Sequence, residues 1–123
     1  MKIYEYLTIK FTNFKETETV LKKYKNLEIN ILWTNQYLSL QGPHVMNAFK
    51  VLGRKKQVNL IAEVGKNIGL ALTVIELEVK KMSISNNLDK DLTEKIKSLA
   101  KKKGIQVLIT EKFKKIKNIN DLI

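Results

Sequence analysis

Short runs with apolar residues at every second position, separated by stretches of helical spacing, constrain the fold of this chain most strongly. Residues 4–11 and 27–33 alternate in this way, which is the period of a strand with one buried face. Between these runs Asn13 can cap a helix whose apolar side chains form a single stripe. Residues 37–40 predict a third strand, which closes a hairpin with the second.

The second half of the chain predicts further strands and helices. Residues 58–64 predict a strand that Gly65 ends, and residues 68–81 predict a helix with one apolar face. Residues 82–84 fit a short strand. In residues 44–52 the apolar residues have helical spacing over a short stretch, so this segment stays open between helix and loop.

The last third of the chain predicts one more helix and one more strand, followed by a basic tail. Residues 88–103 predict an amphipathic helix that Gly104 ends, and residues 105–109 predict a strand. The tail from Lys112 onward is basic, and we expect it to be weakly structured.

The order of elements through residue 84 predicts an α+β fold. We expect a ferredoxin-like β-α-β-β-α-β sandwich, with a helix and a strand as a C-terminal extension. No linker-like composition separates the two parts. We therefore expect residues 1–84 to form the α+β domain and residues 85–123 to form a basic extension, either within the same domain or appended to it.

The charge of the chain points to a polyanion as partner. Basic residues number 23 against 12 acidic ones, for a formal net charge of +11, and Arg54 is the only arginine. Lysine is a compact charge suited to phosphate contact, and it lacks the bidentate fork with which arginine reads guanine. The lysine, asparagine and isoleucine excess also fits AT-rich coding, but that bias alone would not deplete the acidic residues.

Several classes of chemistry are excluded or disfavoured by composition. The chain has no cysteine, which excludes disulfides, thiolate metal sites and cysteine nucleophiles. His44 is the only histidine, which argues against a histidine metal site or acid–base pair. We expect no catalytic residues, metal, cofactor or small-molecule substrate. We also expect no signal peptide and no membrane partner, since no apolar run reaches the ~18 residues of a membrane helix.

Three segments carry a resemblance to a known family. Residues 8–14 fit its opening strand, residues 37–45 with Pro43-His44-Val45 fit its hairpin arm, and residues 54–56 fit its basic step. This pattern resembles the universal small-subunit ribosomal protein S-ten family. The hairpin is shorter than in that family and residues 85–123 have no counterpart, which suggests a divergent, organelle-type member.

The resemblance implies a structural protein of the small ribosomal subunit. It implies ribosomal RNA of the subunit head and neighbouring head proteins as partners, with Pro43, His44, Arg54, Lys55 and Lys56 as RNA-binding residues. The location implied is the mitochondrial ribosome, with a bacterial or archaeal cytoplasm as the alternative.

The tail supplies further candidates for RNA contact: Lys112, Lys114, Lys115 and Lys117. A loosely ordered basic segment can fold along an RNA backbone when it binds. We therefore include these four lysines among the predicted RNA-binding residues.

A second resemblance covers about residues 37–82. Residues 61–71 are similar to the turn and helix of Alba-like nucleic-acid-binding proteins, and residues 44–47 are similar to the start of their first helix. This alternative implies a dimer that binds DNA or RNA.

A remote alternative is a metal-dependent nuclease. Glu76, Glu78 and Lys80 contain the Glu-x-Lys pattern of such enzymes, and Glu63 is the only acidic residue upstream that could complete a metal site. The pattern falls on a predicted helix, where Glu78 and Lys80 would not face each other.

Overall fold

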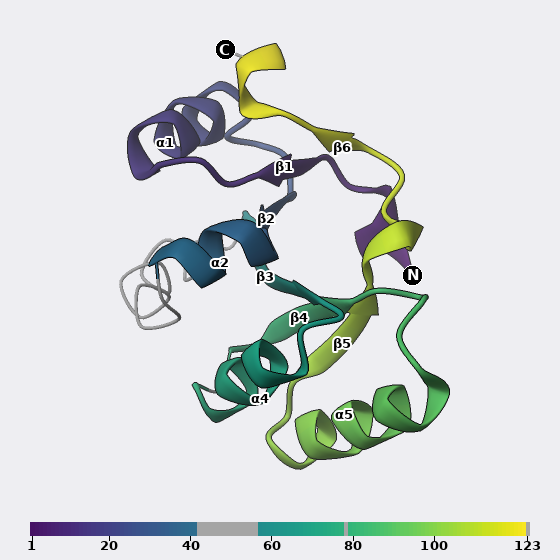
Figure 1. Ribbon diagram of the computed structural model, residues 1–123. Coiled ribbons are helices and arrows are strands. Elements are labelled where there is room, and N and C mark those ends of the chain that lie inside the picture. The colour runs from purple at the N-terminus through teal and green to yellow at the C-terminus, as the bar shows by residue number, and fades with distance from the viewer. Residues whose placement is uncertain (42–56, 78, 123) are drawn as a thin grey trace.

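The computed structural model describes residues 1–41, 57–77 and 79–122. These residues form a mixed fold of helices and one six-stranded sheet, in which every pair of neighbouring strands is parallel (Figure 1). The strands are β1 (Thr8–Lys10), β2 (Ile29–Trp33), β3 (Val58–Gly65), β4 (Lys81–Ile84), β5 (Gln106–Ile109) and β6 (Ile116–Lys117). The α-helices are α1 (Phe14–Lys23), α2 (Asn35–Gln41), α4 (Ile68–Glu76) and α5 (Lys90–Lys102). Three short 3-10 helices are η1 (Lys2–Glu5), η2 (Thr110–Lys112) and η3 (Ile119–Asp121).

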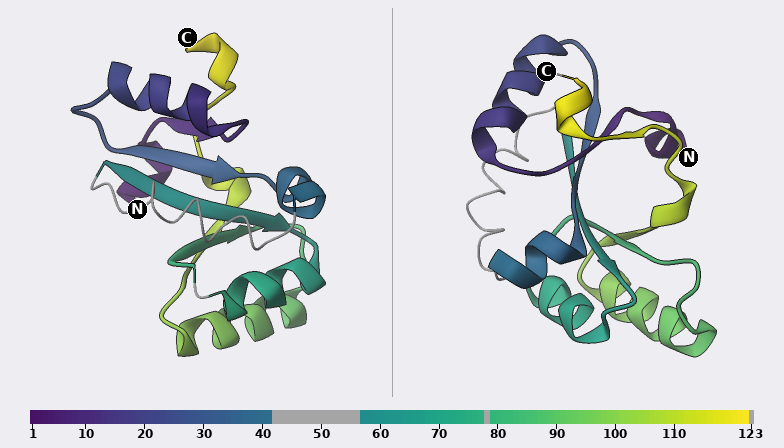
Figure 2. Two further views of the ribbon diagram at one scale, coloured as in Figure 1. Left: turned by 90° about the vertical axis from the view of Figure 1, so that its left-hand side faces the viewer. Right: turned by 45° about the horizontal axis from the view of Figure 1, so that its top comes forward.

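The strand order is β5-β4-β3-β2-β1-β6, so the first five strands add to the sheet in chain order. Successive right-handed crossovers in one direction place their helices on the same face of a sheet. The helices α1, α2, α4 and α5 accordingly lie on one side, and η1 and η2 lie on the other (Figures 1 and 2). After β5 the chain returns past this second side and adds β6 beside β1.

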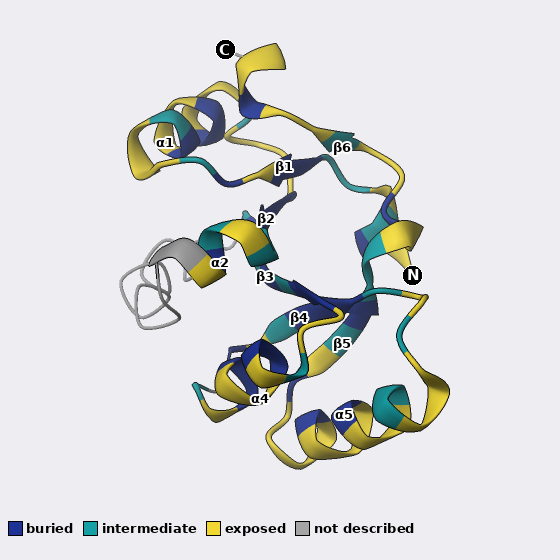
Figure 3. Ribbon diagram, viewed as in Figure 1, coloured by how far each residue is buried: buried dark blue, intermediate teal, exposed yellow. Residues whose placement is uncertain are grey.

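The helical face holds the larger core. Trp33 on β2 is fully buried there, and its ring lies 5.0 Å from that of Phe11, centroid to centroid. The helices contribute apolar stripes of the expected spacing, for example Val20 and Leu21 on α1 and Ile96 on α5. In Figure 3 the inner strands are mostly buried, while the outer surface of α5 is exposed. Burial of this stripe stabilises each helix against the sheet.

The opposite face has a smaller apolar cluster. Leu32, Ile61 and Leu108, from three strands, are covered there by Ile3 and Phe113 from the two ends of the chain. Beside them the hydroxyl oxygen of Tyr4 accepts a hydrogen bond from the backbone of Ile109, 2.9 Å long, which ties η1 to β5. Parallel sheets need cover on both faces, and here the termini supply the second cover.

A buried asparagine on this face joins three elements. Asn30 on β2 is fully buried. Its Nδ2 donates to the carbonyl of Ile3, 2.7 Å away, and to the hydroxyl of Thr8, 3.0 Å away. Its Oδ1 accepts from Nδ2 of Asn59 at 3.2 Å. A buried polar group with its partners satisfied fixes the position of η1 against the sheet.

The presence of both helices and strands is confirmed, but the ferredoxin-like topology is not. Such a sandwich needs antiparallel neighbours, and each strand pair in the described ranges is parallel. The strands predicted at 58–64 and 105–109 and the helix at 88–103 match β3, β5 and α5 closely.

The hairpin prediction was wrong. Residues 37–40 belong to helix α2, and the Leu38 N–H donates to the Thr34 carbonyl over 3.0 Å in the first helical turn. Leu38 is fully buried against the sheet. Four alternating residues are too few to fix a period, and the parallel pairing of β2 with β3 requires a crossover in place of a tight turn.

Three other expectations need correction. The tail from Lys112 is structured, because β6 pairs with β1 and the Lys115 carbonyl accepts from the Thr8 N–H at 2.9 Å. The first strand is limited to Thr8–Lys10, since η1 occupies Lys2–Glu5. The helix predicted to reach residue 81 ends at Glu76, because β4 begins at Lys81.

We predict that Asn30→Ala lowers the free energy of unfolding by about 2 kcal/mol, because it removes the two hydrogen bonds that the buried Asn30 amide donates to Ile3 and Thr8. Urea denaturation monitored by circular dichroism measures this loss. Asn26→Ala, at an exposed position outside this network, is the matched control and should change the free energy of unfolding by no more than about 0.5 kcal/mol. Equal, small losses in the two variants would contradict a structural role for the Asn30 network.

Candidate functional site

The carboxyl ends of the central strands surround a hollow of about 470 Å³. Because the strands are parallel, the carboxyl ends of β1, β2 and β3 lie at the same end of the sheet. The η2–β6 segment closes the hollow from the side. The residues that line it are Lys10, Phe11, Thr12, Leu32, Thr34, Asn35, Gln36, Tyr37, Glu63, Thr110, Ile116 and Asn118. This end of the sheet is where ligands bind in open parallel sheets.

Glu63 is the acidic group of the hollow. Its Oε1 accepts a hydrogen bond from the backbone N–H of Asn35 at 3.0 Å, whereas Oε2 has no hydrogen-bond partner in the described ranges. Burial raises the pKa of Glu63 above its ordinary value, against the opposing effects of the Asn35 hydrogen bond and the Lys10 charge. The ammonium of Lys10 thus acts on Glu63 through space, and no ion pair within 4.0 Å joins the two.

A local irregularity in β3 positions this carboxylate. The pairing register of β3 with β4 shifts between Glu63 and Gly65. Gly65 has φ +60°, and a Cβ at this position would lie 2.8 Å from Nδ2 of Asn35 and 3.3 Å from Oε2 of Glu63. Glycine is therefore required here both for the backbone conformation and for the close approach of the two side chains.

Other groups of the hollow differ in how far their hydrogen bonding is satisfied. The Thr110 hydroxyl donates to the Ser83 hydroxyl at 2.9 Å. The hydroxyl of Thr12 is buried and has no hydrogen-bond partner. Leu32 and Ile116 give the hollow an apolar part, and both belong to or pack against the smaller cluster.

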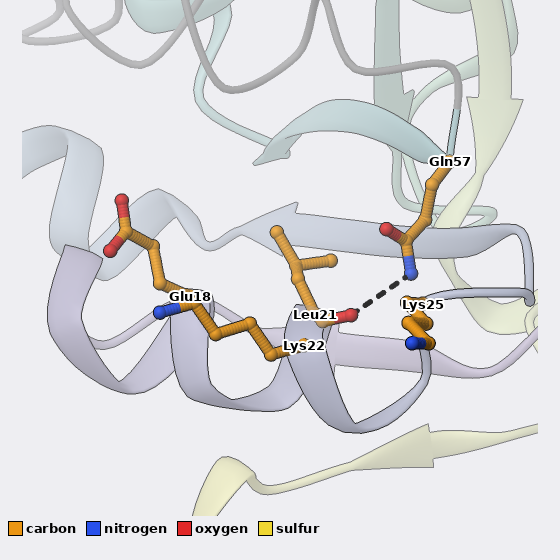
Figure 4. A pocket seen from close by; sticks show the side chains of 5 residues that line it. All are labelled: Glu18, Leu21, Lys22, Lys25 and Gln57. Carbon is orange, nitrogen blue, oxygen red and sulfur yellow. Dashed lines mark hydrogen bonds between the residues drawn. The ribbon is translucent and has the colours of Figure 1, made fainter.

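A second hollow of similar size lies beside α1 (Figure 4). It is lined by Glu18, Leu21, Lys22, Lys25 and Gln57. The Gln57 amide donates to the Leu21 carbonyl at 3.3 Å and to the Tyr24 carbonyl at 2.6 Å. Its polar group thus holds the start of β3 against the end of α1, so we assign this hollow a structural role.

All five predicted RNA-binding residues of the central segment lie outside the described residues: Pro43, His44, Arg54, Lys55 and Lys56. Nothing in the described ranges bears on them.

The four tail lysines lie on the η2–β6 segment, and all are exposed. Nζ of Lys114 forms an ion pair with Oε1 of Glu5 at 2.5 Å. Lys112, Lys115 and Lys117 form no ion pair with a described residue. None of these lysines lines the hollow, where the cation is Lys10.

The described residues provide no metal site for the nuclease alternative. Glu76 is exposed at the end of α4, Lys80 is exposed before β4, and Glu78 lies outside the described residues. Glu63 lies at the hollow instead. Within residues 1–41, 57–77 and 79–122 no group of three or more histidine, cysteine or acidic side chains is placed to hold a metal ion.

Comparison with known protein families and curated proteins identifies no family for this chain. Neither the models of known protein families nor the curated proteins contain a match to this chain. Among the described residues, no helix combines the length and apolar character needed to span a membrane.

From the sequence, Glu63 was predicted only as a possible metal ligand, and Lys10 and Asn35 were not among the predicted site residues. A usable signal was present: Glu63 is the one charged residue within the otherwise apolar or neutral run of β3. A carboxylate placed in a central strand is expensive to bury, which marks it as a candidate functional group.

We predict that Glu63→Gln stabilises the protein at neutral pH. The raised pKa means that the folded state holds this proton more tightly than the unfolded chain does. The carboxylate therefore reduces stability as pH rises through the folded-state pKa, and it contributes no penalty below the ordinary value. Urea denaturation should show a stability gain for Glu63→Gln at pH 7 that shrinks toward about pH 4.

Glu94→Gln, at an exposed position of α5, is the matched control for the loss of one carboxylate. A gain at Glu63 that does not depend on pH, or a loss of stability at pH 7, would contradict the burial of an ionised group.

Proposed function

We propose that this protein binds the phosphate backbone of structured RNA as a non-catalytic component of a ribonucleoprotein, the small ribosomal subunit. The observation that supports this most is the surface charge. Every lysine in the described ranges is exposed except Lys81, which is half-buried. Between described residues the only ion pair within 4.0 Å is Lys114–Glu5. Together with the net charge of +11, the exposure of these lysines favours a polyanionic partner.

The edge of the sheet at β6 is the best-defined part of this surface. Lys112, Lys115 and Lys117 are exposed and lie within six residues, and the backbone of residues 115–117 is held by β1. A fixed backbone presents these charges at constant spacing, which suits contact with successive phosphates. Lysines on an edge strand also prevent it from pairing with other chains, and this role needs no RNA. A binding measurement distinguishes the two roles.

The ribosomal part of the proposal comes from the sequence resemblance alone. Residues 8–14 supply a strand followed by α1, in the order that the S-ten family has. Residues 37–41 are helical and no longer support a hairpin arm. Residues 43–45 and 54–56 carry the rest of the resemblance, and with it the expectation of head-region ribosomal RNA, neighbouring head proteins and a mitochondrial location.

We predict that replacing Lys112, Lys115 and Lys117 together by glutamine weakens RNA binding and its dependence on salt. Each lost phosphate contact removes roughly 0.7 (single strand) to 0.9 (duplex) from the slope of log affinity against log salt, so the triple variant should lose about 2 to 3. Fluorescence anisotropy of a labelled RNA, titrated at several salt concentrations, gives this slope.

The matched control replaces three exposed lysines of α5, Lys90, Lys95 and Lys97, by glutamine. The control changes the net charge equally, but α5 lies at the opposite end of the sheet from β6 (Figure 1). An equal fall in slope would contradict the β6 edge as the binding surface, and absence of RNA binding by the unmodified chain would overturn the proposal.

Sedimentation of a native lysate tests association with the ribosome: the chain should sediment with the small subunit.

A further inference from the structure

The hollow at the carboxyl ends of β1, β2 and β3 has the character of a ligand site. The contact of the β6 lysines with RNA phosphates, as proposed above, does not involve it. It lies beside β1, where the winding of the sheet changes direction. The connection from β1 crosses the helical face, and the connection into β6 passes the opposite face. Crevices at such switch points bind ligands in parallel α/β proteins, and about 470 Å³ is within the usual range for small-molecule sites.

The most specific group in the hollow is the Glu63 carboxylate. Oε1 is held by the Asn35 N–H at 3.0 Å, which fixes the direction of the group. Oε2 has no hydrogen-bond partner in the described ranges, and Lys10 is not within 4.0 Å. Glu63 as a whole is half-buried, but Oε2 is not among the buried polar atoms that lack a hydrogen-bond partner, so solvent reaches it and a ligand with N–H donors can take the place of that solvent.

We infer that this hollow binds one guanine nucleotide, either free or at an unpaired position of an RNA strand; the second case rests on the proposed function. Guanine alone among the four RNA bases presents two adjacent donors, N1–H and N2–H, on its pairing edge. Adenine and cytosine place an acceptor beside their amino group, and uracil flanks its N–H with two carbonyls. Oε2 is open and Oε1 keeps a second lone pair beside its bond from Asn35, so a fixed carboxylate can accept both donors of guanine and repels the acceptors of the other bases.

The remaining lining fits the other parts of a nucleotide. The exposed ammonium of Lys10 can contact the phosphate. Tyr37 and Ile116 are half-buried and offer apolar surface for the base. The Asn118 amide can bond the ribose hydroxyls. One hollow thus combines the anion contact, the apolar contact and the donor recognition that a nucleotide requires.

The first arm of the test uses free nucleotides with the full chain. Isothermal titration calorimetry with the 5′-monophosphates of guanosine, adenosine, cytidine and uridine should show guanosine monophosphate binding at least ~10-fold tighter than the others. Glu63→Gln should abolish this preference, because an amide presents a donor to the donors of guanine. Glu94→Gln should retain it. Circular dichroism checks that Glu63→Gln is folded, as its stability prediction requires.

The second arm uses two octamers of uridine that carry a single guanosine or a single adenosine. Tighter binding of the guanosine octamer that Glu63→Gln removes supports the RNA-bound form. Preference for free guanosine monophosphate without preference between the octamers supports the free nucleotide. Absence of guanine preference in both arms, or a preference that Glu63→Gln leaves intact, overturns the inference. Lysine-dependent RNA binding that persists in that case leaves the proposed function standing.

Discussion

The pairing of β1 with two strands, β2 and β6, is the constraint on which the rest of the structure depends. β1 has only three residues, yet Thr8 donates to the Lys115 carbonyl on one side, and Asn30 and Phe11 connect it to β2 on the other. This double pairing draws the C-terminal segment back across the sheet. It thereby provides the second cover for the sheet and brings η2 and β6 to the edge where β1, β2 and β3 end.

The hollow follows from this arrangement. Lys10 and Glu63 come from the carboxyl ends of β1 and β3, and Thr110 and Asn118 come from the returning segment. The shift of register at Gly65 aims the acidic group of β3 at the same place. The short strand β1 and the irregular strand β3, on either side of β2, therefore bring an acid, a cation, hydroxyls and apolar surface together in this hollow.

Much of the secondary structure could be predicted from the sequence, because the longer elements have an unambiguous period. Helix α5 has over three turns of amphipathic spacing, and β3 is an eight-residue, mostly apolar strand that ends at Gly65. α2 was mistaken for a strand because four alternating residues at 37–40 fit either period. Strand β6 could not be foreseen, since two residues among lysines carry no periodic signal.

The parallel order of the sheet could not be derived from local pattern at all. A strand in an antiparallel hairpin and a strand joined by a parallel crossover show the same alternation of apolar residues. Which of the two arrangements forms depends on which neighbouring strand accepts and donates the backbone hydrogen bonds. The hollow was missed for the same reason. Lys10, Glu63 and Asn118 are far apart in the sequence and meet only once β1 is paired on both sides, although the lone acid within β3 was visible beforehand.

Backbone nuclear Overhauser contacts in the isotopically labelled full chain test the double pairing of β1 most directly. The structure predicts parallel contacts between amide and α protons that join Ile9 to residues beside Ile31 and to residues beside Lys117. Strong α-proton to α-proton contacts between residues 27–33 and 37–40 would establish the antiparallel hairpin instead. That result would contradict the parallel sheet, and with it the hollow and the surface that depend on it.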